Sequence, residues 1–265
     1  MVILYNLDTQ SGSSKIHREM TKPICLWSGP RNVSTALMYS FAEIEQIQVV
    51  DEPLYGHYLR VSGADHPGRE EIIERMNCDG NAVAAQLLVA PPNGRRLFIK
   101  HMAHHLVDLE LDFLQEVENV FLIRDPREML PSLTIQLPHA TQKDTGLRRQ
   151  WQLFEQLTSS GHRPVVLDSR ELLLAPTVVL EKLCRHLDVP FSAAMLSWKP
   201  GPNAADGIWA KHWYHAVHAS SGFAPYVAKP EFPTHLQPLL DECRPWYEKL
   251  FAHAIRAKTH GESAE

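Results

Sequence analysis

The sequence predicts an α/β protein built as a three-layer α/β/α sandwich with a mainly parallel central sheet. Short apolar segments of strand length alternate along the chain with longer segments of helical length, which is the order produced by strand–helix–strand units with right-handed crossovers. Some apolar segments are continuous, such as the one at 119–123, and such strands suit a sheet covered on both faces. The 265 residues suffice for one sizeable domain.

The first half of the chain contains four expected strands, each bounded by a turn or a proline. Gly29-Pro30 ends the first strand, and Pro53 ends the second because it holds Glu52 in extended geometry. The turn at 91–94 leads into the third strand. We expect strands at 24–28, 47–52, 95–100 and 119–123, a polar segment at 56–80, and helices at 34–42, 69–76, 81–89 and 108–117.

The second half continues the alternation and then changes character. Asp125-Pro126 marks a helix start, because proline is tolerated in the first turn. From Phe191 onward, prolines and tryptophans break up the pattern and indicate an irregular cover over the sheet edge. The tryptophans there are either core residues or the wall of a substrate pocket. We expect a strand at 164–168 and helices from 126, at 147–158, at 177–187 and at 236–257.

One domain is expected over residues 23–258. Residues 1–22 are polar around Ser11-Gly12-Ser13-Ser14 and carry no clear hydrophobic period, so they predict a loose leader, and residues 259–265 predict a tail. The apolar patch near Met1 is too short for a signal peptide, and no later run approaches a membrane span. We therefore expect a cytoplasmic protein without a membrane partner.

The net charge and the cysteine content exclude some classes of binding partner. The formal net charge of −5, with no basic stripe, argues against nucleic-acid binding, since such binding needs many phosphate contacts. The four cysteines are scattered without a Cys-x-x-Cys pair, so we expect reduced thiols and no metal site. The expected partner is a small molecule, and a homodimer is an open alternative to a monomer.

The segment Ser28-Gly29-Pro30-Arg31-Asn32-Val33-Ser34-Thr35 is a candidate anion site. A strand that breaks at Gly29 and restarts as a helix near Ser34 leaves backbone N–H groups unpaired at a positive helix end. The common phosphate loop has a lysine before its hydroxyl residue, whereas Val33 stands there. A nucleoside triphosphate with Mg²⁺ is therefore disfavoured. Any strand–turn–helix unit could also look like this.

Three further positions could carry chemistry at strand ends. Glu52 closes the second strand, where open parallel sheets bind ligands, and a solvated loop carboxylate is the other interpretation. Lys100 closes the third strand and is followed by His101, His104 and His105. These histidines could be ligands or acid–base groups, but no matching carboxylate motif accompanies them, so zinc is disfavoured.

Arg124 and Ser132 form a fourth feature. Arg124 ends the strand at 119–123, and Ser132 lies eight residues later on the following helix. On its own this pair is weak, because Arg124 could pair with a carboxylate and Ser132 could cap a turn.

Together, four segments in this order resemble the sulfotransferases that use 3′-phosphoadenosine 5′-phosphosulfate, especially the divergent bacterial-type and plant-type members. Residues 28–35 are similar to the family's 5′-phosphosulfate loop, and residues 121–132 to its 3′-phosphate element. Residues 164–190 resemble the strand, loop and helix after the substrate region, and residues 198–209 a late basic loop. The resemblance implies a nucleotide-binding fold of the P-loop type.

The resemblance also implies a cofactor site. Donor binding would fall to Gly29, Pro30, Arg31, Asn32, Val33, Ser34, Thr35, Arg124, Ser132 and Lys199, with adenosine 3′,5′-bisphosphate as the product and no metal. Many members place a tyrosine near the position of Ser169, and this chain has no aromatic residue there, so the adenine contacts are not assigned.

The catalytic residues implied by the resemblance are Glu52, Lys100 and His104. Lys100 would face the transferring sulfonate, and Glu52 ranks before His104 as the base. Cytosolic members have lysine, one residue and then histidine, whereas His101 follows Lys100 directly and would point to the other face. The implied activity moves a sulfuryl group to a hydroxyl or amine of a small acceptor. A P-loop kinase and a non-catalytic nucleotide-binding relative are the alternatives.

Overall fold

The computed structural model of the chain describes residues 22–228 and 231–257, so most of the expected leader and the expected tail lie outside the described residues. Six strands form one sheet in the order β2-β3-β1-β4-β5-β6, and every neighbouring pair is parallel. The predicted parallel sheet is therefore confirmed. The strands are β1 (Ile24–Ser28), β2 (Ile47–Asp51), β3 (Arg96–Met102), β4 (Glu118–Ile123), β5 (Val165–Asp168) and β6 (Ala254–Ile255).

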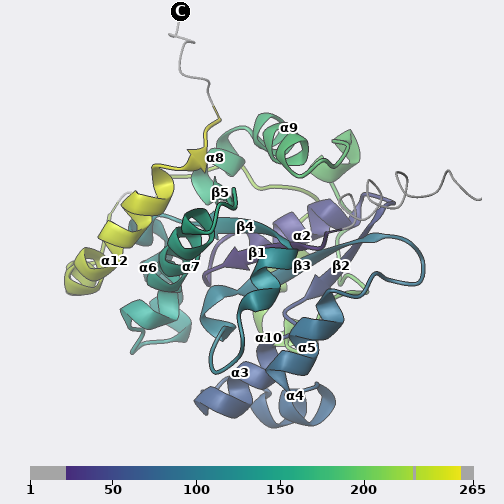
Figure 1. The fold of residues 1–265 in the computed structure, drawn as a ribbon. Coiled ribbons are helices and arrows are strands. Elements are labelled where there is room, and N and C mark those ends of the chain that lie inside the picture. The colour runs from purple at the N-terminus through teal and green to yellow at the C-terminus, as the bar shows by residue number, and fades with distance from the viewer. Residues whose placement is uncertain (1–21, 229–230, 258–265) are drawn as a thin grey trace, which may run out of the picture.

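Helices cover both faces of this sheet, as the continuous apolar strands predict (Figure 1). Because successive side chains of a strand point to opposite faces, Ile24 and Leu26 pack on one side and Cys25 and Trp27 on the other. The first side is covered by α2 (Ser34–Ala42) and α9 (Pro176–His186). The second is covered by α5 (Gly80–Leu87), α7 (Leu147–Ser159) and α12 (Gln237–Phe251).

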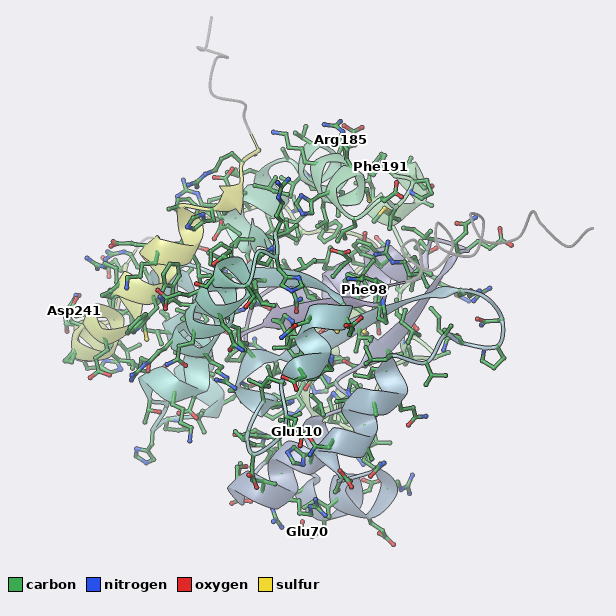
Figure 2. All side chains as sticks on the ribbon, in the orientation of Figure 1. Glu70, Phe98, Glu110, Arg185, Phe191 and Asp241 are labelled. Atoms are coloured by element: carbon green, nitrogen blue, oxygen red, sulfur yellow. The ribbon has the colours of Figure 1, made fainter. Side chains whose placement is uncertain are left out.

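Aromatic packing fixes the central strands. Phe98 of β3 lies in the middle of the molecule, whereas Glu70, Arg185 and Asp241 lie at its periphery (Figure 2). Phe98 is fully buried and stacks on Phe41 of α2, with ring centroids 4.0 Å apart. Burying rings of this size removes much apolar surface from water and supplies a large part of the driving force for folding.

A smaller cluster lies at the carboxyl end of β2. Tyr55 and Leu59 of α3 (Tyr55–Ser62) pack with Ile72 of α4 (Arg69–Arg75) and with Trp209, which precedes α10 (Ala210–Trp213). Chain segments about 150 residues apart in sequence therefore meet beside the sheet. The other helices are α6 (Pro126–Gln136), α8 (Ser169–Leu174) and α11 (His215–His218).

Several predicted elements differ from the structure. The expected helix at 108–117 is wrong: only residues Asp112–Glu116 form a 3₁₀ helix, and Asp108 adopts a left-handed φ of 45° that no α-helix tolerates. The expected final helix stops at Phe251, because the chain then pairs with β5 as the two-residue strand β6. Helix α3 falls in the segment we expected to be a polar loop.

Two buried contacts hold the ends of the central strands. Gln150 of α7 is fully buried, and its Nε2 donates to the carbonyl oxygens of Trp27 at 2.7 Å and Leu122 at 3.0 Å. Beside them, a Cβ atom at Gly29 would collide with the carbonyl oxygen of Thr145, so only glycine fits there. These contacts fix the positions of the loop that follows β1 and of the residues that follow β4.

None of the helices within 22–228 and 231–257 combines the length and apolar character needed to cross a lipid bilayer.

Candidate active site

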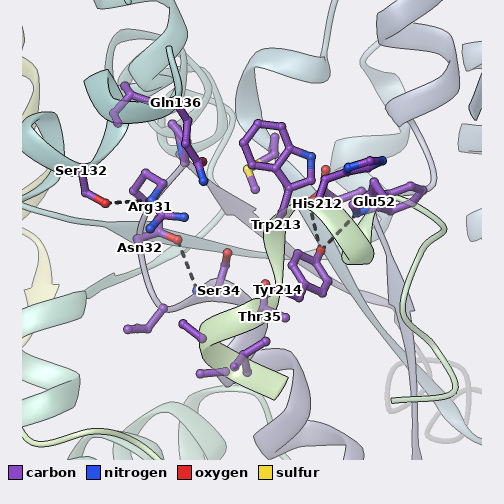
Figure 3. Close-up of a pocket in the computed structure, with 18 of the residues that line it drawn as sticks. Arg31, Asn32, Ser34, Thr35, Glu52, Ser132, Gln136, His212, Trp213 and Tyr214 are labelled. Carbon is purple, nitrogen blue, oxygen red and sulfur yellow. Dashed lines mark hydrogen bonds between the residues drawn. The ribbon is translucent and has the colours of Figure 1, made fainter. Parts of the chain in front are cut away.

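A cavity of about 610 Å³ opens at the carboxyl ends of the parallel strands. Its lining includes the loop after β1, Glu52 after β2, the segment after β3, and Arg124 after β4. This is the edge at which open parallel sheets bind ligands, because side chains from several strands converge there. Figure 3 shows Arg31 and Ser132 on one side of the cavity and Glu52 with His212 on the other.

The predicted nucleotide residues come together at one end. Arg31 Nε donates to Ser132 Oγ of α6 at 2.9 Å (Figure 3). Arg124 Nη1 donates to the carbonyl oxygen of Arg31 at 2.8 Å. Arg31 has a left-handed φ of 57°, a strained conformation that is often retained at functional sites. The loop after β1 is therefore tied both to α6 and to the residue that follows β4.

The amino-terminal turn of α2 borders the same end. Ser34, Thr35 and Ala36 line the cavity. Asn32 shapes the entry to the helix, because its Nδ2 donates to the Leu122 carbonyl at 3.1 Å and its Oδ1 accepts from the Ser34 N–H at 3.2 Å. Backbone N–H groups of a first helical turn have no partner within the helix, so this turn suits an anion.

Two guanidinium groups add positive charge here. Burial and the neighbouring Arg124 charge both lower the pKa of Arg31, although an arginine stays protonated at neutral pH. Arg124 Nε lies 3.4 Å from Glu128 Oε2, and Tyr226 donates to the other oxygen of that carboxylate at 2.6 Å. An anion between Arg31 and Arg124 would relieve their mutual repulsion.

A buried polar network lies at the other end. Lys100 Nζ donates to Asp51 Oδ1 at 2.9 Å, to Glu52 Oε1, and to the Tyr214 hydroxyl at 2.6 Å. Tyr214 donates in turn to Asp51 Oδ2 at 2.8 Å and accepts from Trp209 Nε1 at 3.2 Å. Two carboxylates thus share one ammonium group away from bulk water.

Glu52 is the member of this network with the features of a reactive group. It lines the cavity and is 5% exposed. The extended geometry expected before Pro53 is wrong, because β2 ends at Asp51 and Glu52 has a left-handed φ of 38°. Burial raises the pKa of its carboxyl, and the nearby Lys100 offsets this only in part. Burial alone would lower the pKa of Lys100, but the Asp51 and Glu52 carboxylates hold it well above its ordinary value. Lys100 therefore stays charged, while Glu52 can exchange a proton.

The histidines that follow Lys100 separate onto two faces. His101 is buried on the α7 side of the sheet, stacked on Trp27 with centroids 4.4 Å apart, as strand alternation requires. His104 and His105 line the cavity, and His105 Nδ1 lies 3.9 Å from Glu52 Oε2. Burial lowers the pKa of His101 to about 3 and that of His104 to about 4, so both rings are neutral at pH 7.

Most of the sequence-predicted site residues lie at the cavity. Pro30, Arg31, Asn32, Val33, Ser34, Thr35, Glu52, His104, Arg124 and Ser132 all line it. Gly29 lies just beneath the loop, against Thr145. Their individual roles stay predictions.

Two residues lie elsewhere than expected. Lys100 is fully buried and is not among the cavity-lining residues, because the cross-strand neighbour Asp51 and the adjoining Glu52 draw its ammonium group between them. Lys199 is exposed and outside the cavity lining. In its place, Ser220, Gly222, Phe223 and Ala224 contribute to the lining, because Gly222 pairs in an isolated bridge with Ser197 and turns this segment inward.

Sequence reasoning missed Tyr214 and Asp51. No local motif marks Tyr214, and its contact with Asp51 spans 163 residues.

The tryptophans of the late segment were expected to be either core residues or the wall of a pocket, and both kinds occur. Trp209 and Trp213 line the cavity, whereas Trp198 packs in the core. Within the described chain, no group of three or more histidine, cysteine, aspartate or glutamate side chains is arranged to hold a metal ion.

Comparison with known proteins gives three findings. A family model described as "Sulfotransferase domain" matches residues 22–254. Two curated proteins of Arabidopsis thaliana, Branched-chain-amino-acid aminotransferase-like proteins 1 and 2, are each 37% identical over 229 residues, which is 86% of this chain and 41% of theirs. The chain therefore spans less than half the length of these relatives.

Among solved structures, the sulfotransferase domain from the curacin biosynthetic pathway superposes with a TM-score of 0.50 at 16% identity, covering 84% of this chain and 97% of that one. This likeness is one of fold. Because the family model matches nearly all of the described residues, the chain belongs to the sulfotransferase domain family.

Proposed function

We propose that this protein moves a sulfuryl group from 3′-phosphoadenosine 5′-phosphosulfate to a small acceptor. The observation that carries the proposal is the contact of Arg31 with Ser132 and Arg124 at one end of a cavity whose other end holds Glu52. It joins the two segments that resemble the family's 5′ and 3′ anion sites, although they lie about 100 residues apart in sequence.

The residues at the arginine end suit a nucleotide with separate 5′ and 3′ anions. The first turn of α2 and Arg31 would hold the 5′ end, and Arg124 with Ser132 would hold the 3′-phosphate. The cavity, at about 610 Å³, is within the usual range for small-molecule sites. The 5′ and 3′ assignments depend on this arrangement and on the family resemblance.

The donor, when bound, supplies an activated sulfuryl group with the bisphosphate as its leaving group. Backbone N–H groups at the start of α2 and the guanidinium of Arg31 stabilise the negative charge that develops on the leaving phosphate. Glu52 accepts the proton of the acceptor, and its raised pKa makes it a stronger base than an exposed carboxylate. Lys100 and Tyr214 hold the Glu52 carboxylate in place rather than contacting the sulfonate.

The name of the curated relatives suggests a different reaction, which this cavity does not suit. An aminotransferase that uses pyridoxal phosphate needs a lysine that can form a Schiff base in its site. No lysine is among the described residues that line the cavity, and the ammonium of Lys100 is engaged by two carboxylates and a tyrosine. The match also covers only 41% of those relatives, so the name describes much longer proteins.

Two measurements test the proposal. Incubation with ³⁵S-labelled donor and a panel of hydroxyl and amine acceptors should give a labelled sulfated acceptor. The Glu52→Gln variant should bind adenosine 3′,5′-bisphosphate but should form no labelled acceptor. Calorimetric titration with adenosine 3′,5′-bisphosphate and with ATP·Mg²⁺ should show that the bisphosphate binds more tightly. Preference for ATP·Mg²⁺ would favour a kinase, and bisphosphate binding without transfer to any acceptor would favour a non-catalytic relative.

A further inference from the structure

Charge is divided between the two ends of the cavity. Arg31 and Arg124, which follow β1 and β4, are the arginines in its lining, and the carboxylates in its lining are Glu52, Asp65 and Asp144. Strands β3 and β1 separate β2 from β4, so Glu52 and Arg124 start from strand ends about 14 Å apart. Figure 3 shows Arg31 and Glu52 on opposite sides of the cavity.

The carboxylate end is walled by rings. We call Tyr55, Tyr58, His66, His104, His105, Trp209 and Trp213 the aromatic box, and all of them line the cavity. The His105 ring stacks on two tyrosines, with centroids 4.9 Å from Tyr55 and 4.5 Å from Tyr58, and the two tyrosine rings lie 6.5 Å from each other. Trp209 meets the Tyr55 ring edge-on at 5.1 Å, and Trp213 meets His66 at 6.2 Å.

The imidazoles of the box are uncharged at neutral pH. Burial lowers the pKa of His66, of His104 and of His105 below the ordinary histidine value. The negative Asp144 acts on the His66 and His104 rings from the neighbouring 3₁₀ helix Gln142–Thr145. The aromatic box therefore presents uncharged rings, and the carboxylates of Glu52, Asp65 and Asp144 line the same cavity.

One buried atom of the box points to a ligand independently. His105 is 1% exposed and lines the cavity, and its Nδ1 has no hydrogen-bond partner among the described residues. A buried polar atom without a partner is costly, and a bound ligand or water normally supplies one. This atom lies 3.9 Å from Glu52 Oε2, so a polar group bound here would lie beside the proposed base.

We infer that the acceptor is an amino alcohol whose ammonium group binds in the aromatic box between the rings and the carboxylates, with its hydroxyl at Glu52. The inference rests on the proposed function. Ammonium groups bind over aromatic faces and beside carboxylates, whereas an anionic acceptor would meet Asp65 and Asp144 as well as Glu52, whose charge Lys100 balances in part. The hydroxyl is the reacting group, because a protonated or quaternary nitrogen has no lone pair to donate.

The step balances with the groups already named. The acceptor oxygen forms a bond to sulfur, and the bond between sulfur and the bridging phosphate oxygen breaks with its electrons leaving on the bisphosphate. The acceptor O–H bond breaks, and its proton passes to a carboxylate oxygen of Glu52. No oxidant, reductant or metal takes part in this exchange.

Binding of matched ligand pairs tests the inference. Choline is compared with its carbon isostere 3,3-dimethylbutan-1-ol, and 5-aminopentan-1-ol with hexan-1-ol, by calorimetry with and without saturating adenosine 3′,5′-bisphosphate. We expect the ammonium member of at least one pair to bind about tenfold more tightly than its neutral partner. If neither ammonium compound binds more tightly than its neutral partner, the inference is overturned.

A variant locates the preference. Asp144→Asn keeps an oxygen for its bonds to Thr141 but removes the charge, so the preference for the ammonium ligand should shrink several-fold. Asp112→Asn, at an exposed position, is the matched control and should leave the preference unchanged. An unchanged preference in Asp144→Asn would also contradict the inference. If the wild type does not bind adenosine 3′,5′-bisphosphate, the result counts against the proposed function instead.

Discussion

The Nε atom of Arg31 donates a hydrogen bond of 2.9 Å to Ser132 Oγ, across 101 residues of sequence. The carbonyl oxygen of Arg31 accepts a second bond, of 2.8 Å, from Arg124. Arg31 therefore ties the loop after β1 to the end of β4 and to α6. The two proposed anion sites, which are separate in the sequence, thereby lie on one surface, and preorganised charge needs no rearrangement when a nucleotide binds.

Gly29→Ala should disrupt this surface. The added Cβ collides with the backbone oxygen of Thr145, so the loop must shift, and we expect bisphosphate affinity to fall at least about tenfold in calorimetry. Gly94→Ala is the control: it has open space and a φ of 69°, so it costs only about 1 kcal/mol of backbone strain. Wild-type affinity in Gly29→Ala would show that the loop position does not matter for binding.

Glu52→Gln should separate transfer from binding. The amide cannot take a proton, so the transfer rate should fall by about 10²- to 10⁴-fold while bisphosphate affinity is retained. In the wild type, the base must be ionised, so kcat/KM should rise with pH through a pKa above the ordinary glutamate value, because burial raises it. His104→Gln tests the other candidate base: if it loses this rise and Glu52→Gln keeps it, the assignment of Glu52 is wrong.

Tyr214→Phe should shift the pH dependence as well as stability. The change leaves Lys100 and Trp209 without a shared acceptor, which should lower the free energy of unfolding by about 1–3 kcal/mol. Tyr214 also lowers the pKa of Glu52 through a hydrogen bond, so kcat/KM should rise at a higher pH in the variant. Tyr226→Phe, which loses one partly exposed bond, should leave that pH unchanged. If the pH dependence of kcat/KM is the same in both variants, Tyr214 contributes to stability alone and not to the pKa of Glu52.

Buried His101 should make the fold sensitive to acid. Its pKa is lowered to about 3 by burial, whereas the unfolded chain takes up the proton near 6.5, so stability is lost as pH falls between these values. The loss approaches about 1.4 kcal/mol per pH unit. His101→Phe, which can keep the stacking on Trp27, should make the unfolding free energy fall less steeply with acid in urea titrations at pH 4–7. The other buried histidines keep their share of the slope.

The same substitution at exposed His139 is the control for His101 and should leave the acid slope as in the wild type. A slope that is equally steep in His101→Phe would place the acid sensitivity elsewhere.

The sequence alone predicted the features that depend on local chemistry. Continuous apolar strands require a sheet covered on both sides, and the alternation of strand residues sends His101 and Lys100 to opposite faces. Arg124 and Ser132 were a weak pair by spacing alone. The resemblance of residues 121–132 to the family's 3′-phosphate element implied that both belong to one site, and both line the cavity.

Features that depend on distant contacts could not be predicted. The position of the Lys100 ammonium group is set by Asp51, its direct partner on the neighbouring strand β2, and by Tyr214, which lies 114 residues later in the sequence. The strand β6 has two residues and forms only because β5 offers a free edge. Lys199 was matched by its charge alone, and the bridge from Ser197 to Gly222 brings a different segment to the cavity.

The central claim is that a 3′-phosphate binds at Arg124 and Ser132. It is tested most directly by one calorimetric comparison of adenosine 3′,5′-bisphosphate with adenosine 5′-monophosphate, in the wild type and in Arg124→Ala. We expect the bisphosphate to bind at least about tenfold more tightly to the wild type, and this advantage to vanish in the variant while the monophosphate affinity changes little. Equal affinities for the two nucleotides in the wild type would contradict the account.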